Sequence, residues 1–181
     1  IWLIVAEDYM PFNINVTTDR AVFNAAPTSQ KQMVIFTPTN TASPGAGGTA
    51  HLNSWGTNDP CWSFGGTVKS AAESGSHEAG HTFNIIHDGT TSQAYYAGHN
   101  FWGPIMGACY NQYIVQWCKG DYANANNQED DLAKISIKVP YRTDDAGNDI
   151  TTTKLLALNG SGSGNVSLAS NFGIIERTTD K

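Results

Sequence analysis

The stretch SGSHEAGHTFNIIHDG, residues 74–89, contains three of the chain's five histidines. His77 and His81 are four residues apart, so on a helix their side chains lie on one face, about 6 Å apart, and both reach a single cation. His87 cannot join them if the helix continues, because ten residues would carry it ~15 Å along the axis. The helix therefore has to end and turn back, and Asn84 stands where a residue that tolerates positive φ is needed.

The eleven residues 77–87 read HEAGHTFNIIH. This pattern resembles the HExxHxxGxxH signature of the metzincin zinc peptidases, with Asn84 at the position of the usual glycine. Met106 follows the third of these histidines by nineteen residues, within the glycine-rich GPIMGACY, and resembles the methionine turn beneath the metal in that family. The resemblance implies that the three histidines bind Zn²⁺, with Asn84 and Met106 as structural supports.

Asp88 comes directly after His87, as in the adamalysin or reprolysin branch, and the chain resembles secreted bacterial members of that branch. There this acid is implied to anchor the loop below the site, so Asp88 is a further expected structural residue. Astacin-like and serralysin-like members carry a tyrosine two residues after the turn methionine, where this chain has Ala108. Tyr110 and Tyr113 are nearby but out of that register, so neither is assigned to the role.

Glu78, next to His77 on the helix, indicates what the metal does. Three neutral imidazoles leave Zn²⁺ with its double positive charge and an open position, where bound water reaches a pKa near ~7. Glu78 can take the proton of that water as general base and deliver it to the leaving amine. We expect a secreted zinc endopeptidase that acts on protein or peptide substrates. The alternative is a zinc-bound recognition or adhesion module with little turnover, which would not need a base beside the metal.

In metzincins the strand before the active-site helix forms the upper rim of the cleft, and TAHLNSW has that place here. The resemblance implies that substrate docks as an added antiparallel strand. The contacts expected for substrate binding are with Thr49, Ala50, His51 and Leu52.

The pattern of apolar residues predicts an α+β fold. The resemblance implies a twisted mixed β-sheet, an active-site helix, a methionine turn and a C-terminal helix, in metzincin order. Helices are expected within residues 1–12, 67–84 and 124–136, and strands within 13–19, 31–39, 47–55 and 61–66. Asn126, with Glu129 three residues on, is expected to cap the last helix.

Residues 1–142 are expected to form the catalytic domain, with the first strand of the metzincin fold upstream of Ile1. Residues 143–181 carry turn signals at Gly147 and in NGSGSGN, and resemble a linker and the start of the β-rich C-terminal module of secreted bacterial metzincins. The chain has no initiator Met and no signal-peptide pattern, which predicts a mature or trimmed part of a longer precursor.

Lys plus Arg number 10 and Asp plus Glu 16, so the net charge is −6, and no stretch is basic, which argues against nucleic acid as a partner. No apolar run reaches the ~18 residues of a membrane span. Cys61, Cys109 and Cys118 form no CxxC pair. One disulfide and one free thiol is the simplest oxidised state, and all three pairings stay open.

His51 and His99 are expected at the surface or the cleft wall rather than as metal ligands. The acidic stretch DYANANNQEDDL, residues 121–132, lacks the ligand spacing of an EF-hand. Helix capping is the preferred explanation of this stretch, with Ca²⁺ as an open second cofactor.

Overall fold

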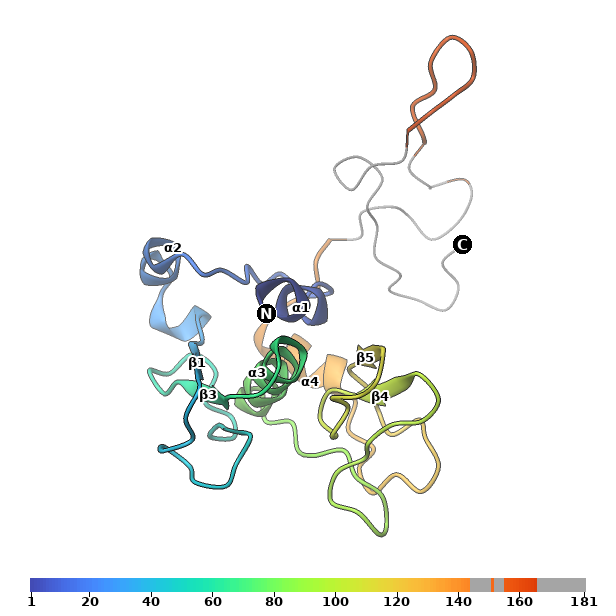
Figure 1. Ribbon diagram of the computed structural model, residues 1–181. Helices are drawn as coiled ribbons and strands as arrows, with labels where there is room; N and C mark the ends of the chain where they lie inside the picture. Colours follow the sequence, from blue (N-terminus) through green and yellow to red (C-terminus); the bar gives the residue numbers. More distant parts are fainter. Residues whose placement is uncertain (144–150, 152–154, 166–181) are drawn as a thin grey trace. The chain divides into compact units, whose positions relative to one another are not determined.

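The computed structural model describes residues 1–143, 151 and 155–165. The chain divides into two compact units, Ile1–Pro140 and Tyr141–Lys181. The first unit is a small mixed α and β fold (Figure 1), with helices α1 (Trp2–Asp8), α2 (Arg20–Ala25), α3 (Val68–Thr82) and α4 (Asp131–Lys138), a 3-10 turn η1 (Thr28–Gln30), and strands β1 (Val34–Thr37), β2 (Gly48–Thr49), β3 (Cys61–Phe64), β4 (Trp102–Pro104) and β5 (Ile114–Gln116).

The described residues of the second unit include no helix or strand. Asn159 Oδ1 accepts hydrogen bonds from the backbone N–H groups of Ser161 and Ser163, at 3.1 and 2.9 Å, which forms the turn predicted in NGSGSGN. The predicted turn at Gly147 and most of the predicted β-rich module lie outside the described residues.

The three-stranded sheet is mixed and has the order β1-β3-β2, with β1 parallel and β2 antiparallel to the central strand β3. Alternate residues of β3 are buried, as expected for a strand with one face on the core. One of them, Ser63, donates from its hydroxyl to Ala71 O in α3 at 2.9 Å. The sheet therefore packs against α3, and β2 is one of its two edge strands.

Helix α3 is the central element of the first unit: Figure 1 shows the three-stranded sheet on one side of it and the β4–β5 pair on the other. Thr67 and Ser70 form a reciprocal capping box at its start. From Ala71 to Thr82 every residue is buried. Small side chains allow this close packing; Gly75, for example, leaves room for the ring of Phe36 from β1.

Residues 50–55 do not continue strand β2, which corrects the predicted strand 47–55. The backbone N–H groups of Asn53 and Trp55 instead donate to His81 O and Thr82 O, at 3.0 and 2.9 Å. Asn53 has a φ of 60° in the turn that makes this approach. The segment therefore satisfies carbonyls at the C-terminal end of α3 that have no partner inside the helix.

The last helix begins later than predicted, because Asp130 rather than Asn126 is its N-cap. The Asp130 side chain accepts from Ala133 N at 2.9 Å. Asn126 is engaged elsewhere, since its side-chain oxygen accepts from Gly89 N at 2.9 Å. Capping by Asp130 supports the preferred explanation of the acidic stretch.

The predicted strand 13–19 is wrong: these residues belong to neither sheet. Their apolar alternation reflects packing, since Ile14 and Val16 lie against the hydrophobic core. The sequence also failed to indicate α2 and the short parallel pair of β4 and β5, because isolated elements of three to six residues carry little periodic signal.

The predicted disulfide is also wrong, because Cys61, Cys109 and Cys118 are free thiols. Each is directed at a different acceptor: Cys61 at Met33 O (3.6 Å), Cys109 at a Glu73 carboxyl oxygen (3.9 Å) and Cys118 at an Asp88 carboxyl oxygen (3.0 Å). The tertiary structure thus separates side chains that composition alone would pair.

No helix among the described residues is long and apolar enough to cross a membrane.

Candidate metal centre

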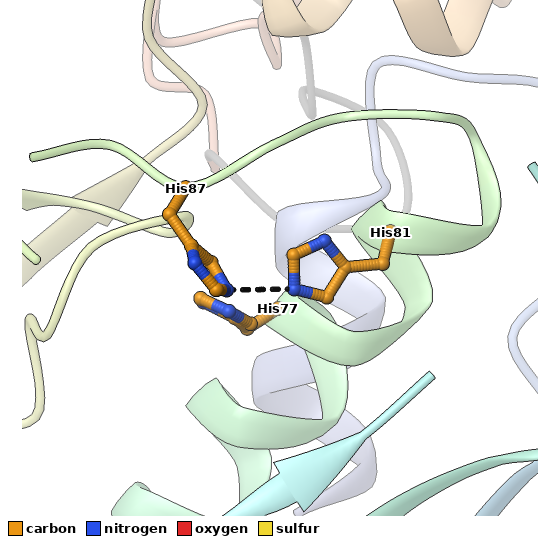
Figure 2. Close-up of side chains that lie close together, drawn as sticks. All are labelled: His77, His81 and His87. Carbon is orange, nitrogen blue, oxygen red and sulfur yellow. Dashed lines mark hydrogen bonds between the residues drawn. The ribbon is translucent and has the colours of Figure 1, made fainter. Parts of the chain in front are cut away.

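Three imidazole rings meet at the C-terminal part of α3 (Figure 2). His77 and His81 extend from the helix, while His87 comes from the segment that returns after it. One nitrogen of each ring lies within 4.8 Å of the other two, and His81 Nε2 is 3.0 Å from His87 Nε2. Two nitrogens bound tetrahedrally to one zinc at ~2.0–2.1 Å would be roughly 3.3 Å apart. The observed separation fits a shared cation.

Backbone carbonyls fix the tautomers of the two helical histidines. His77 Nδ1 is 2.8 Å from Ile105 O, and His81 Nδ1 is 2.8 Å from Ile85 O. A carbonyl oxygen only accepts, so each Nδ1 carries the proton and donates it. The lone pair of each ring is then on Nε2, and outer contacts of this kind orient metal-binding histidines.

The chain reverses at Asn84, whose φ of 68° is the left-handed conformation that the sequence predicted there. Contacts with the region around α4 hold the reversed segment. Lys134 Nζ donates to Asn84 O at 2.7 Å, and Glu129 Oε2 accepts from Ile86 N at 3.0 Å. These contacts present His87 to the two rings on the helix.

Met106 lies beneath α3 and is fully buried. A Cβ atom added at Gly80 would be 2.7 Å from Met106 Sδ, so only glycine allows this approach without displacement of the methionine. The turn also contacts the return segment, because Asp88 N donates to Met106 O at 2.9 Å. Since the preceding carbonyl, Ile105 O, binds the first histidine, this turn supports both parts of the site.

The Asp88 carboxyl group points away from solvent and is fully buried. The Cys118 thiol donates to Oδ2 at 3.0 Å, and the Asn127 amide donates to Oδ1 at 3.4 Å. The same amide group is 3.4 Å from His87 O. Asp88 and the Asn127 amide thus hold the segment that follows the third histidine.

Burial keeps the three imidazoles neutral. It lowers the pKa of His77 to about 3, with the charge of His81 as the next cause, and the pKa of His87 to about 4. Burial also lowers the pKa of His81. Neutral imidazole is the form that binds a metal, so protons compete little for these nitrogens at neutral pH. The donor set of three neutral imidazoles suits zinc and other borderline divalent cations.

Glu78 is 7% exposed and lies against the edge strand. A Cβ atom at Gly48 of β2 would be 2.5 Å from Glu78 Oε1, so the absence of a side chain there makes room for the carboxyl group. Burial raises the pKa of Glu78 to about 7. A carboxyl group with this pKa can both accept and return a proton near neutral pH.

The residues predicted to contact substrate are only partly in the edge strand. Thr49 belongs to β2, whereas Ala50, His51 and Leu52 lie in the following turn. His51 is exposed, with Nδ1 3.4 Å from an Asp59 carboxyl oxygen.

His99 also lies outside the triad and is exposed, with Nδ1 2.8 Å from the Tyr96 hydroxyl. One residue beside the site was missed in the sequence: the ring of Tyr95 lies 4.4 Å from that of His87 and 6.4 Å from that of His77. Nothing in the local pattern distinguishes Tyr95 from the adjacent Tyr96.

No protein-family model, curated protein or solved structure matches this chain. The function of this chain is therefore inferred from the arrangement of its own residues.

Proposed function

We propose that this chain is a secreted zinc-dependent endopeptidase of the metzincin class. The observation that carries the proposal is the convergence of His77, His81 and His87. Backbone carbonyls hold the two helical rings so that Nε2 of each has the lone pair that can bind a metal. The reversal at Asn84 and the buried Met106 beneath the helix support the same family. Secretion is proposed from the resemblance and the weakly charged composition.

A zinc ion bound by these imidazoles would keep its positive charge, polarise a substrate carbonyl and acidify water. The chain's own contribution is proton transfer by Glu78, which does not need to bind the metal. Its carboxylate takes a proton from water as the oxygen attacks the peptide carbonyl, and the carboxylic acid then protonates the leaving amine. Its burial, which raises the pKa to about 7, suits it to both steps, because such a carboxyl group can accept and return a proton near neutral pH.

The substrate in this proposal is an extended peptide that pairs with β2. This strand is one of the two edges of the sheet, and Gly48 brings its backbone against the Glu78 carboxyl group. A peptide added there would place a carbonyl near the proposed base while its backbone groups pair with the strand. Thr49 is the proposed strand contact, and the turn residues after it would bound the cleft.

The test is hydrolysis of a generic protein substrate such as casein by the Zn²⁺-loaded chain, with and without a chelator. Glu78→Gln should reduce kcat by ~10²–10⁴-fold, the usual contribution of a general base, while zinc content stays at the wild-type level. Glu73→Gln is the matched control, since Glu73 lies on the same helix but pairs with Lys69. Chelator-resistant hydrolysis, or full activity of Glu78→Gln, would contradict the proposal.

A further inference from the structure

A second group of metal-binding side chains lies apart from the three histidines. Asp88, Cys118 and Asp131 each offer one oxygen or sulfur atom, and these three atoms lie within 4.8 Å of one another. Both aspartates are fully buried. Buried carboxyl groups are rare unless they are paired or bind a cation, so this cluster needs a physical explanation.

Three segments distant in sequence bring these side chains together. Asp88 follows the last histidine of the triad, Cys118 follows β5, and Asp131 is the first residue of α4. Backbone contacts fix two of them, because Cys118 N donates to Asp131 Oδ2 at 3.0 Å and Asp131 N donates to Cys118 O at 3.1 Å. The Cys118 thiol is 3.0 Å from Asp88 Oδ2, so Cys118 contacts both carboxyl groups, one through its thiol and the other through its backbone N–H.

No ion pair with a basic side chain balances the two carboxyl groups within the described part of the chain. The ion pairs among the described residues are Lys69–Glu73, Lys134–Glu129 and His51–Asp59, and none includes Asp88 or Asp131. Transfer of an unpaired carboxylate into the interior costs several kcal/mol. The charge must be neutralised by protons or by a cation.

The surroundings of Asp131 Oδ1 distinguish neutralisation by protons from neutralisation by a cation. This oxygen is buried and has no hydrogen-bond partner among the described residues. An ionised Oδ1 would lack a donor, and a proton placed on Oδ1 would lack an acceptor, so neither protonation state satisfies the atom. A cation would satisfy Oδ1 and neutralise both carboxyl groups.

We propose that Asp88, Cys118 and Asp131 bind a second divalent cation of the zinc class. A sulfur donor with two carboxylates favours borderline cations such as Zn²⁺ or Co²⁺ over Ca²⁺, which takes six to eight oxygen ligands. The site is structural: it connects the region after β5, the start of α4 and the segment that carries His87. The proposal does not depend on peptidase activity.

The test is a Co²⁺ titration of the metal-free chain, followed by absorption spectroscopy. Wild type should bind two equivalents, of which one produces a thiolate-to-cobalt charge-transfer band. Cys118→Ser should lose the band and one equivalent, and Asp131→Asn should lose one equivalent. Cys109→Ser, which removes a buried thiol outside the cluster, should keep both equivalents and the band.

His81→Ala separates this proposal from the proposed function, because it should lose the other equivalent and keep the thiolate band. Wild-type protein that binds Co²⁺ without a thiolate band would overturn the proposal, even if every variant failed to fold. Two equivalents retained by folded Cys118→Ser and Asp131→Asn would overturn it as well. An excess of Ca²⁺ should not displace the Co²⁺ that gives the band, and displacement would refute the zinc-class assignment.

Discussion

Helix α3 and the return segment 83–88 supply the same site by different means. The helix holds His77 and His81 through its own backbone hydrogen bonds and its buried packing against the sheet. The return segment has no ladder of its own and is held by remote residues, including Lys134 and Glu129. The helical half is therefore held by the hydrogen bonds and packing of α3, whereas the other half depends on side chains that are remote in sequence. The difference predicts where substitutions act strongly and where they act weakly.

The largest effect is expected at His81, a proposed metal ligand on helix α3. His81→Ala should lose the Zn²⁺ ion that we propose the three histidines bind, because two imidazoles bind far more weakly than three. His51→Ala is the matched control, since His51 is exposed and lies outside the triad. Metal content after dialysis measures the difference. Equal loss in both variants would show that the triad does not bind the ion.

The next effect concerns the contact between α1 and the helix. Ser76 donates to Asp8 Oδ2 at 2.5 Å, yet burial raises the pKa of Asp8 to about 7, with the charge of Glu73 as a further cause. The folded state therefore binds this proton more tightly than the unfolded chain, whose pKa is 3.8. The resulting stability is complete below pH 3.8 and is lost as the pH rises to about 7.

Asp8→Asn removes this titration. As the pH rises from 5 to 7, the free energy of unfolding of the variant should therefore increase relative to that of wild type by about 1 kcal/mol per pH unit. This value takes the partial exposure of the group into account. Urea unfolding at several pH values measures it. A pH-independent difference between the two proteins would refute the assignment to Asp8.

A smaller effect is expected where the helix meets the methionine turn. The Cβ atom of Gly80→Ala would lie 2.7 Å from Met106 Sδ and 3.0 Å from a ring carbon of Trp117. Overpacking costs about 1–3 kcal/mol, and the higher helix propensity of alanine returns about 1 kcal/mol of that. Gly47→Ala, which meets no atom within 4 Å, should be close to neutral. Denaturant midpoints compare the two, and equal midpoints would contradict the packing.

The smallest effect is expected in the return segment. Asn84→Ala should lower the free energy of unfolding by about 1 kcal/mol, because alanine pays the steric cost of the left-handed conformation. Asn84→Gly should be unchanged within a few tenths of a kcal/mol, since Lys134 bonds to the backbone and glycine accepts this φ. If alanine and glycine behaved alike, the reversal at residue 84 would not need its positive φ.

The same contrast explains what the sequence could predict. The spacing of His77 and His81 predicts a shared helix face, whereas the resemblance to the metzincin signature adds His87, whose position then requires a reversal of the chain. The carbonyl of Ile105, which sets the tautomer of the first histidine, depends on tertiary packing and has no local signal. The need for glycine at position 48 becomes apparent only once the tertiary structure places the Glu78 carboxyl group against it.

Side chains with two competing partners gave the errors. Asn126 fits a helix cap by its spacing from Glu129, but the tertiary structure uses Asn126 for Gly89 and Glu129 for Ile86. Asp130 then takes the cap. Residues 50–55 fit a strand by their pattern, but the N–H groups of Asn53 and Trp55 donate to carbonyls at the end of α3 instead. Local patterns predict which roles a residue can take, while remote partners determine which one it takes.

The carbonyls of Ile105 and Met106 are consecutive, and they contact the first histidine and the residue after the third. Two adjacent peptide units thus contact both halves of the site. The preceding loop is tied to the same two segments, because Tyr96 N donates to Asp88 O at 2.7 Å and Ala108 N donates to Tyr96 O at 2.8 Å. A residue inserted between positions 105 and 106 would displace the carbonyl of Ile105 relative to that of Met106. The turn should therefore tolerate no change in length.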